Sequence, residues 1–163
     1  MGFNKEDINK ISLAAQNIRV MLLRKYNANL FGKCIEATDA LVEIYKSQGY
    51  QAKAKQVWCL YEYFENCSNY CYEEHWLVEI IKGKEKLYID VTLDQFQWAF
   101  GRKLPEIYMQ KKLPKFLLTR KPGKTTLDKC GWNDWYNYGN YVNNFEYYQS
   151  GDNNGIKQTK YEV

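Results

Sequence analysis

The sequence predicts one globular domain in which two helices come first and several strands follow. At 163 residues the chain is long enough to bury a sizeable core. Its fifteen tyrosines and five tryptophans stand against only three prolines, and such a composition is typical of a packed chain rather than a disordered one. Apolar residues recur at helical spacing before residue 50 and in strand-like runs after it.

Two helices are predicted in the first third of the chain. Over residues 6–25, apolar side chains recur every three or four positions, with lysines and arginines elsewhere. A polar break then leads to Gly32. Residues 34–48 form the second helix, and Gly49 is expected to end it.

Three strands are predicted after the helices. The first covers residues 51–61, and the next two cover 75–82 and 85–92 on either side of Gly83-Lys84. A Gly-X pair between strand-like runs is typical of a two-residue hairpin turn. That turn sets the register so that paired residue numbers sum to 167, which places Asp90 diagonally across from His75 on the same sheet face.

Four other segments are distinguished by composition. Residues 62–74 are polar and are expected to be irregular. Residues 101–124 hold 8 basic and 1 acidic side chain, and we interpret them as a solvated connector. The alternative is that they bind an acidic substrate, nucleic acid or a membrane surface. The aromatic residues of 131–148 are expected to pack on the sheet or, alternatively, to line a substrate groove. The single domain is assigned to residues 1–150, and the polar tail 151–163 is expected to be disordered.

Several classes of protein are disfavoured by the sequence. We find no secretory signal and no run of eighteen apolar residues, so no membrane span is expected. The five cysteines are odd in number and loosely spaced. Reduced thiols in a cytoplasm are therefore the expectation.

Three residues have the order and setting of one active site. Cys34 follows Gly32-Lys33 at the start of the second helix. His75, the only histidine, opens one strand, and Asp90 ends the next. A thiol attacks as the thiolate, so a base and a helix N-terminus beside it favour reaction. The base in turn needs a third group that fixes its tautomer.

Four short motifs follow one another around these residues. They are Gly-x-Cys at 32–34, Gly-Tyr-x-Ala at 49–52, His-Trp-x-Val-Glu at 75–79 and Tyr-Ile-Asp-x-Thr at 88–92. Over roughly residues 29–96 the chain resembles the transglutaminase-like branch of the papain-fold cysteine enzymes. The Gln95-Phe96 pair that follows is similar to bacterial papain-fold effector and toxin domains.

The resemblance implies an α+β fold with a papain-like or transglutaminase-like core, in which helices pack on a small antiparallel sheet. It implies Cys34 as nucleophile, His75 as general base and acid, and Asp90 as the group that orients His75. It also implies an amide side chain upstream of the cysteine in the oxyanion hole. Asn29 is the nearest match, and the backbone N–H of Cys34 would be the second donor.

Trp76 and Gln95 complete the set of oxyanion or substrate candidates. No cofactor and no metal are expected. Large eukaryotic transglutaminases have a tryptophan after the cysteine and use calcium, whereas Ile35 stands here and no acidic loop is visible. A calcium-dependent cross-linking enzyme is therefore not expected.

The favoured hypothesis is a cysteine-dependent enzyme that acts on amide bonds: a peptidase, deamidase or isopeptidase. Its expected partner is a protein or peptide substrate rather than nucleic acid, in the cytoplasm or, by the effector resemblance, after delivery to another cell. The oligomeric state stays open. One alternative is a papain-like fold without chemistry that binds other proteins. Another is a structural zinc site made from His75, Cys59, Cys67 and Cys71.

Overall fold

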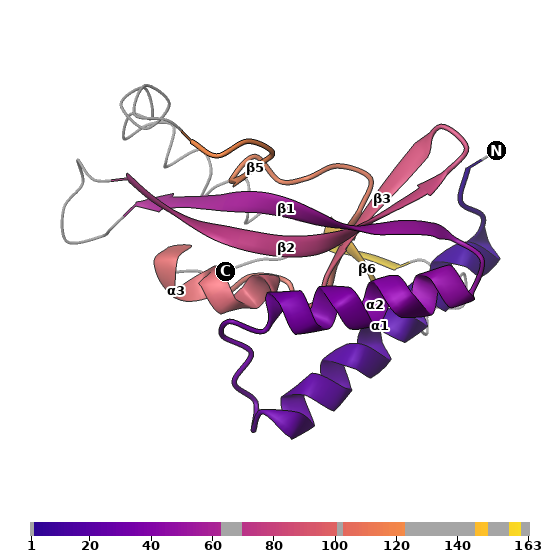
Figure 1. Cartoon of the computed structure of the whole chain (residues 1–163), viewed down its shortest axis with the longest axis horizontal. Helices are drawn as coiled ribbons and strands as arrows, with labels where there is room; N and C mark the ends of the chain where they lie inside the picture. Colours follow the sequence, from indigo (N-terminus) through magenta and orange to yellow (C-terminus); the bar gives the residue numbers. More distant parts are fainter. Residues whose placement is uncertain (1, 63–69, 101–102, 123–145, 150–156, 161–163) are drawn as a thin grey trace.

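The computed structural model describes residues 2–62, 70–100, 103–122, 146–149 and 157–160. These residues form an α+β fold in which two long helices lie beside a curled antiparallel sheet (Figure 1). The α+β class expected from the sequence is thus confirmed. The sheet has five strands in the order β4-β3-β2-β1-β5. Their bounds are β1 Gln51–Glu62, β2 Tyr70–Lys82, β3 Glu85–Asp90, β4 Tyr108–Gln110 and β5 Leu117–Leu118.

The two long helices begin and end close to the predicted positions. Helix α1 covers Lys5–Lys25 and α2 covers Cys34–Ser47. The side chains of Asn4 and Asp7 accept each other's backbone N–H at 2.8 and 2.9 Å, which satisfies two of the unpaired amides at the start of α1. Gly49 follows α2 with φ +90°, a left-handed conformation that glycine adopts without strain.

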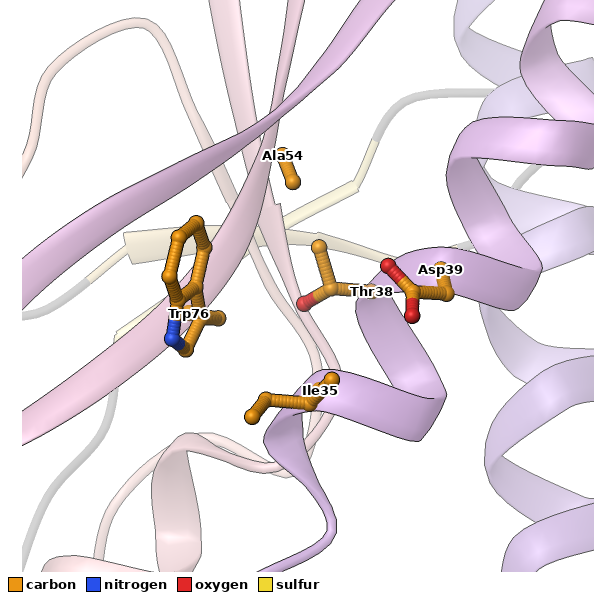
Figure 2. A pocket seen from close by; sticks show the side chains of 5 residues that line it. All are labelled: Ile35, Thr38, Asp39, Ala54 and Trp76. Carbon is orange, nitrogen blue, oxygen red and sulfur yellow. The ribbon is translucent and has the colours of Figure 1, made fainter.

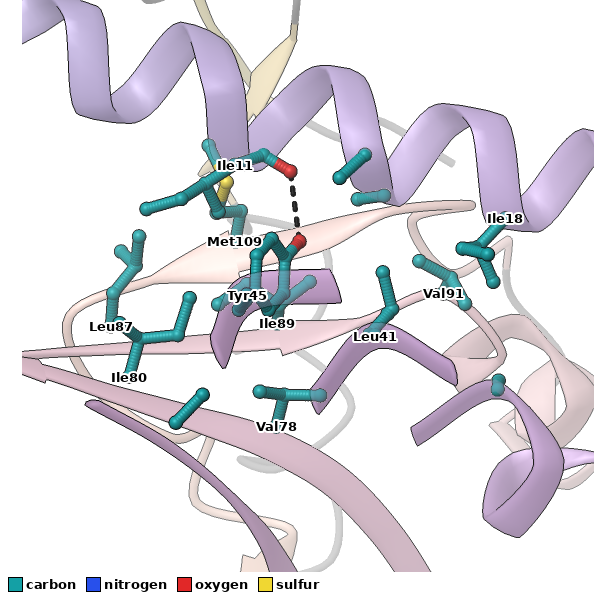
Figure 3. Packing of buried hydrophobic residues seen from close by; sticks show 14 of the residues in the cluster. Ile11, Ile18, Leu41, Tyr45, Val78, Ile80, Leu87, Ile89, Val91 and Met109 are labelled. Atoms are coloured by element: carbon teal, nitrogen blue, oxygen red, sulfur yellow. Dashed lines mark hydrogen bonds between the residues drawn. The ribbon is translucent and has the colours of Figure 1, made fainter. Parts of the chain in front are cut away.

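The main core lies between these helices and the sheet (Figure 3). Ile11 of α1, Tyr45 of α2 and Ile80 of β2 are fully buried in it. The Tyr45 hydroxyl donates a 2.8 Å hydrogen bond to the Ile11 carbonyl, so its polar end is satisfied within the core. Burial of this apolar face, at roughly 25 cal/mol per Å² of area removed from water, holds α2 against the strands.

The hairpin between β2 and β3 has the predicted register. Val78 pairs with Ile89 and Lys82 with Glu85, so paired residue numbers sum to 167. The strand β2 is longer than predicted, because residues 70–74 extend it. Those residues are polar, but their backbones pair with β1 up to Tyr70 opposite Glu62. Pairing by backbone hydrogen bonds does not require apolar side chains, which is why the polar composition was misleading.

The basic segment 101–124 is more than a solvated connector. Its described part, residues 103–122, contains β4 and β5, which pair with β3 and β1 and form the two edges of the sheet. Leu104, Tyr108 and Phe116 are buried in a second apolar cluster with Val57 and Leu77. Leu77 alternates with Val78 along β2, so this cluster lies on the other face of the sheet. The charge of the segment had concealed the spacing of its apolar residues.

The remaining segments connect or follow the sheet. After β3 come the 3₁₀ turn η1 (Leu93–Phe96) and the short helix α3 (Gln97–Phe100). Most of the aromatic stretch 131–148 lies outside the described residues. Its end, β6 (Glu146–Gln149), pairs with β7 (Lys157–Lys160), a short strand within the segment assigned to the tail. Among the described helices, none is long and apolar enough to cross a membrane.

Candidate active site

Cys34 is the first residue of α2. The loop before it turns at Gly32, whose φ of +74° lies in the left-handed region that favours glycine. The Lys33 N–H donates to the Leu30 carbonyl at 3.1 Å, which closes the turn. The first backbone amides of a helix have no partner within it. The N–H of Cys34 therefore points out of the helix end as a donor for an anion, and the helix dipole favours negative charge there.

His75 and Asp90 form a buried pair. His75 Nε2 and Asp90 Oδ2 are 2.5 Å apart, and both side chains are almost completely excluded from solvent. The other carboxylate oxygen, Oδ1, accepts hydrogen bonds from the Thr92 backbone N–H at 2.9 Å and from the Thr92 hydroxyl at 3.3 Å. The Asp-x-Thr sequence thus fixes the carboxylate that holds the imidazole. The diagonal contact expected from the hairpin register is present.

The imidazole of His75 is bonded to Asp90 and interacts with Cys34. The edge-to-face contact with Phe96, with ring centroids 5.0 Å apart, fixes the plane of the ring. Because Nε2 is bonded to Asp90, Nδ1 is the nitrogen left for the thiol. Nδ1 forms no hydrogen bond of ordinary geometry, yet Cys34 interacts with the ring closely enough to affect its protonation. A loose contact of this kind is common in catalytic pairs before substrate binds.

The electrostatics of the pair favour a charged imidazole. Burial by itself lowers the pKa of His75, but the charge of Asp90, its hydrogen bond and the interaction with Cys34 raise the pKa to about 9. His75 is therefore protonated at neutral pH. An imidazolium beside Cys34 is the charge that stabilises a thiolate.

Cys59 provides a contrast within the same chain. It is buried on β1, and burial raises the pKa of its thiol well above the usual value. Such a thiol is inert because the charged form is not solvated or paired. Within the described part of the chain, Cys34 and Cys59 are both free thiols, and Cys34 is the one that interacts with the imidazole.

Gln95 connects the two halves of the site. Its side-chain oxygen accepts the Gly32 N–H at 3.2 Å, and its amide nitrogen donates to the Thr92 carbonyl at 3.0 Å. The amide therefore joins the loop before Cys34 to the turn after Asp90. With both ends of the amide engaged, Gln95 has the contacts of a positioning residue rather than those of an oxyanion donor.

The other two candidates have different surroundings. Asn29 is exposed, and its side-chain oxygen accepts the Phe31 N–H at 3.1 Å, which leaves only its NH₂ group to donate to a ligand. Trp76 lines a small pocket together with Ile35, the residue after the cysteine (Figure 2). The start of α2 thus lies beside the part of β2 that carries His75.

Arg19 is the residue that the sequence analysis missed. Helical spacing suggested that the basic residues of α1 lie on its solvent side, but Arg19 is buried. Its guanidinium donates to both carboxylate oxygens of Asp94, at 2.7 and 3.0 Å, and to the Val91 carbonyl at 2.8 Å. These bonds fix the turn that follows Asp90. Arg19 stands four residues after Ala15 and three before Leu22, so helical spacing places it at the edge of the apolar stripe, and its charge had concealed that position.

The described residues offer no cluster of three or more histidine, cysteine or acidic side chains that could hold a metal ion. In the alternative zinc set, His75 is bonded to Asp90 and Cys59 is buried. Cys67 and the side chain of Cys71 lie outside the described part of the chain.

Comparisons with protein-family models, with curated proteins and with solved structures found no match to this chain.

Proposed function

We propose that the protein is a cysteine-dependent acyl-transfer enzyme that acts on amide bonds. One observation carries the proposal: the single imidazole of the chain is bonded to a buried carboxylate through one nitrogen and interacts with the Cys34 thiol. Nucleophile, base and orienting group in this order are the arrangement of catalytic triads. The resemblance to transglutaminase-like and papain-fold enzymes supports the same chemistry.

In the proposed reaction, the Cys34 thiolate attacks the carbonyl carbon of the amide. The negative charge moves to the carbonyl oxygen, where the Cys34 N–H and the Asn29 side-chain amide stabilise it. As the intermediate collapses, the C–N bond breaks and His75 gives its proton to the leaving amine. The product is a thioester. Water then attacks the thioester while His75 accepts one of its protons. The C–S bond breaks, which regenerates the thiolate and releases a carboxylic acid that loses its remaining proton to solvent.

Selective alkylation tests the proposal. At pH near 6.5, iodoacetamide should label Cys34 at least about tenfold faster than any other cysteine, because the neighbouring imidazolium and the helix N-terminus favour its reaction as the thiolate. His75→Gln should abolish that preference. Asp90→Asn should reduce it by less, because the carboxylate orients the imidazole without carrying the proton.

Circular dichroism of each variant controls for unfolding, and labelling rates are compared across pH so that exposure is separated from reactivity. Equal labelling of the accessible cysteines, unchanged by His75→Gln in a folded protein, would contradict the proposal. That result would favour the alternative of an inert fold that binds other proteins.

A further inference from the structure

A small pocket opens between the first turns of α2 and strands β1 and β2 (Figure 2). Its lining residues are Ile35, Thr38, Asp39, Ala54 and Trp76. Its volume is about 120 Å³, well below the roughly 300–1,000 Å³ of sites for whole small molecules. The pocket is the size for one side chain of a larger ligand.

Two lining residues are chain neighbours of the proposed catalytic pair. Ile35 follows Cys34 on α2. Trp76 follows His75 on β2, and because successive side chains of a strand point to opposite faces, the indole lies on the face that α2 covers. Thr38 stands four residues, about 6 Å of helical rise, beyond Cys34 on the same buried face of α2. A side chain in the pocket would therefore belong to a substrate whose backbone passes the thiol.

The walls of the pocket are apolar, and a carboxylate lies at one side. Ile35, Ala54 and the Trp76 indole supply hydrocarbon and aromatic surface, while Asp39 faces the pocket from α2 on the side away from the indole (Figure 2). Asp39 forms no ion pair with any cation in the part of the chain that the structure describes. Several other carboxylates of the helices and sheet do have such partners, whereas Glu43 and Glu74, which lie outside the pocket, have none among the described residues. The paired ones are Glu6, Asp7, Glu36, Glu79, Glu85 and Asp94.

We propose that this pocket is the specificity subsite of the enzyme and takes a lysine or arginine side chain next to the amide that reacts. The inference rests on the proposed acyl-transfer function. The aliphatic stem of a basic residue packs against Trp76 and Ile35, and its charged head pairs with Asp39. Asp39 is exposed, so the head group stays partly in water and the pair does not incur the cost of a buried one.

Other side chains match the pocket less well. An apolar side chain packs against the apolar walls of the pocket but leaves the Asp39 carboxylate without a partner. An acidic side chain is repelled by Asp39, since like charges in contact are unfavourable. A basic side chain both packs against the apolar walls and pairs with Asp39.

Peptidyl chloromethyl ketones test this inference, because their rate of alkylation reports both recognition and thiol attack. Lysine, norleucine or glutamate is placed at the residue that carries the ketone or at the one before it. Norleucine has the four-carbon stem of lysine without the ammonium group. At one of the two positions, the lysine probe should label Cys34 about threefold to fivefold faster than the norleucine probe, the size expected for an ion pair that stays partly in water. The glutamate probe should be slowest.

Two matched variants locate the effect. Asp39→Asn should bring the lysine-to-norleucine ratio close to 1. Glu43→Gln removes the same charge one turn further along α2, outside the pocket, and should leave the ratio near its wild-type value. A ratio near 1 at both positions in the wild-type protein, or a ratio that Asp39→Asn leaves unchanged, would overturn the subsite. Iodoacetamide separates the two proposals, because selective labelling by it with no lysine preference removes the subsite alone.

Discussion

His75 is the residue on which the proposed chemistry depends, and its contacts make its protonation measurable. It is the only histidine of the chain, so a single imidazole signal reports its titration by NMR. Its environment combines burial, which disfavours charge, with a carboxylate at 2.5 Å, which favours it. The balance determines whether a thiolate–imidazolium pair exists at neutral pH.

We expect the imidazole to titrate with a pKa of about 9 in ¹H–¹⁵N correlation spectra. Asp90→Asn removes the charge that raises this pKa while the burial that lowers it stays. The pKa of His75 should then fall by at least about one pH unit. Thr92→Val removes only the hydroxyl bond to the carboxylate and should change it less. A pKa that is the same in the wild type and in Asp90→Asn would contradict the assigned pair.

The same raised pKa predicts how stability depends on pH. Because the folded-state value of about 9 exceeds the unfolded value near 6.5, the folded protein holds the proton more tightly than the unfolded chain. The stabilisation from His75 is complete below pH 6.5 and is lost as pH rises through about 9. Its full size is about 3 kcal/mol, since each factor of ten in proton affinity contributes about 1.4 kcal/mol. Urea unfolding of the wild type and His75→Gln at pH 6 and pH 10 measures the difference, which should shrink at the higher pH.

At the scale of elements, α2 presents a thiol at one end and a glycine turn at each end. Gly32 and Gly49 both have left-handed φ, and an added Cβ at either position would meet no atom within 4 Å. Both positions therefore require a residue that adopts a left-handed φ without strain. They differ in that only Gly32 lies in the loop that leads to Cys34.

Gly32→Ala and Gly49→Ala should each reduce the free energy of unfolding by about 1–2 kcal/mol, since a side chain in the left-handed region is strained. Only Gly32→Ala should slow alkylation of Cys34, because relief of the strain moves the loop and the Gln95 bond to Gly32. Urea denaturation and iodoacetamide kinetics measure the two effects. Equal effects of both variants on the labelling rate would show that the loop does not position the thiol.

At the scale of the molecule, one buried contact joins the N-terminal helix to the turn after Asp90. The side chains of Arg19 and Asp94 are 9% and 17% exposed, and their two-bond geometry is that of a strong ion pair. Arg19 also donates to the Glu106 carbonyl at 2.8 Å, so it joins three distant parts of the chain. The site thus depends on packing that no single element provides.

Arg19→Met should reduce the free energy of unfolding by about 2–3 kcal/mol, because it leaves the partly buried Asp94 carboxylate without its partner. The double variant Arg19→Met/Asp94→Leu should recover part of that loss, since no unpaired charge remains. Lys10→Met, which removes an exposed partner of Glu6, should cost less than about 0.5 kcal/mol. Urea denaturation of all three variants tests the argument, and similar losses for Arg19→Met and Lys10→Met would contradict it.

Much of the fold could be predicted because local patterns determine it. The apolar spacing of residues 6–25 and 34–48 predicted both long helices, and the Gly83-Lys84 pair predicted the hairpin with its register. The contact between His75 and Asp90 followed from that register alone, since side chains alternate along a strand. These features depend on residues close together in the sequence.

What only the tertiary structure decided depends on residues far apart. The edge strands β4 and β5 formed within a segment whose charge suggested a linker, because a sheet edge supplies backbone partners that composition does not reveal. Burial of Arg19 and engagement of the Gln95 amide likewise required contacts across 63 or more positions. Amino-acid type and spacing therefore determined the helices, the hairpin and the candidate triad. The packing around the candidate triad was decided by non-local contacts. Their energies depend on residues that are far apart in the sequence and meet only in the folded chain.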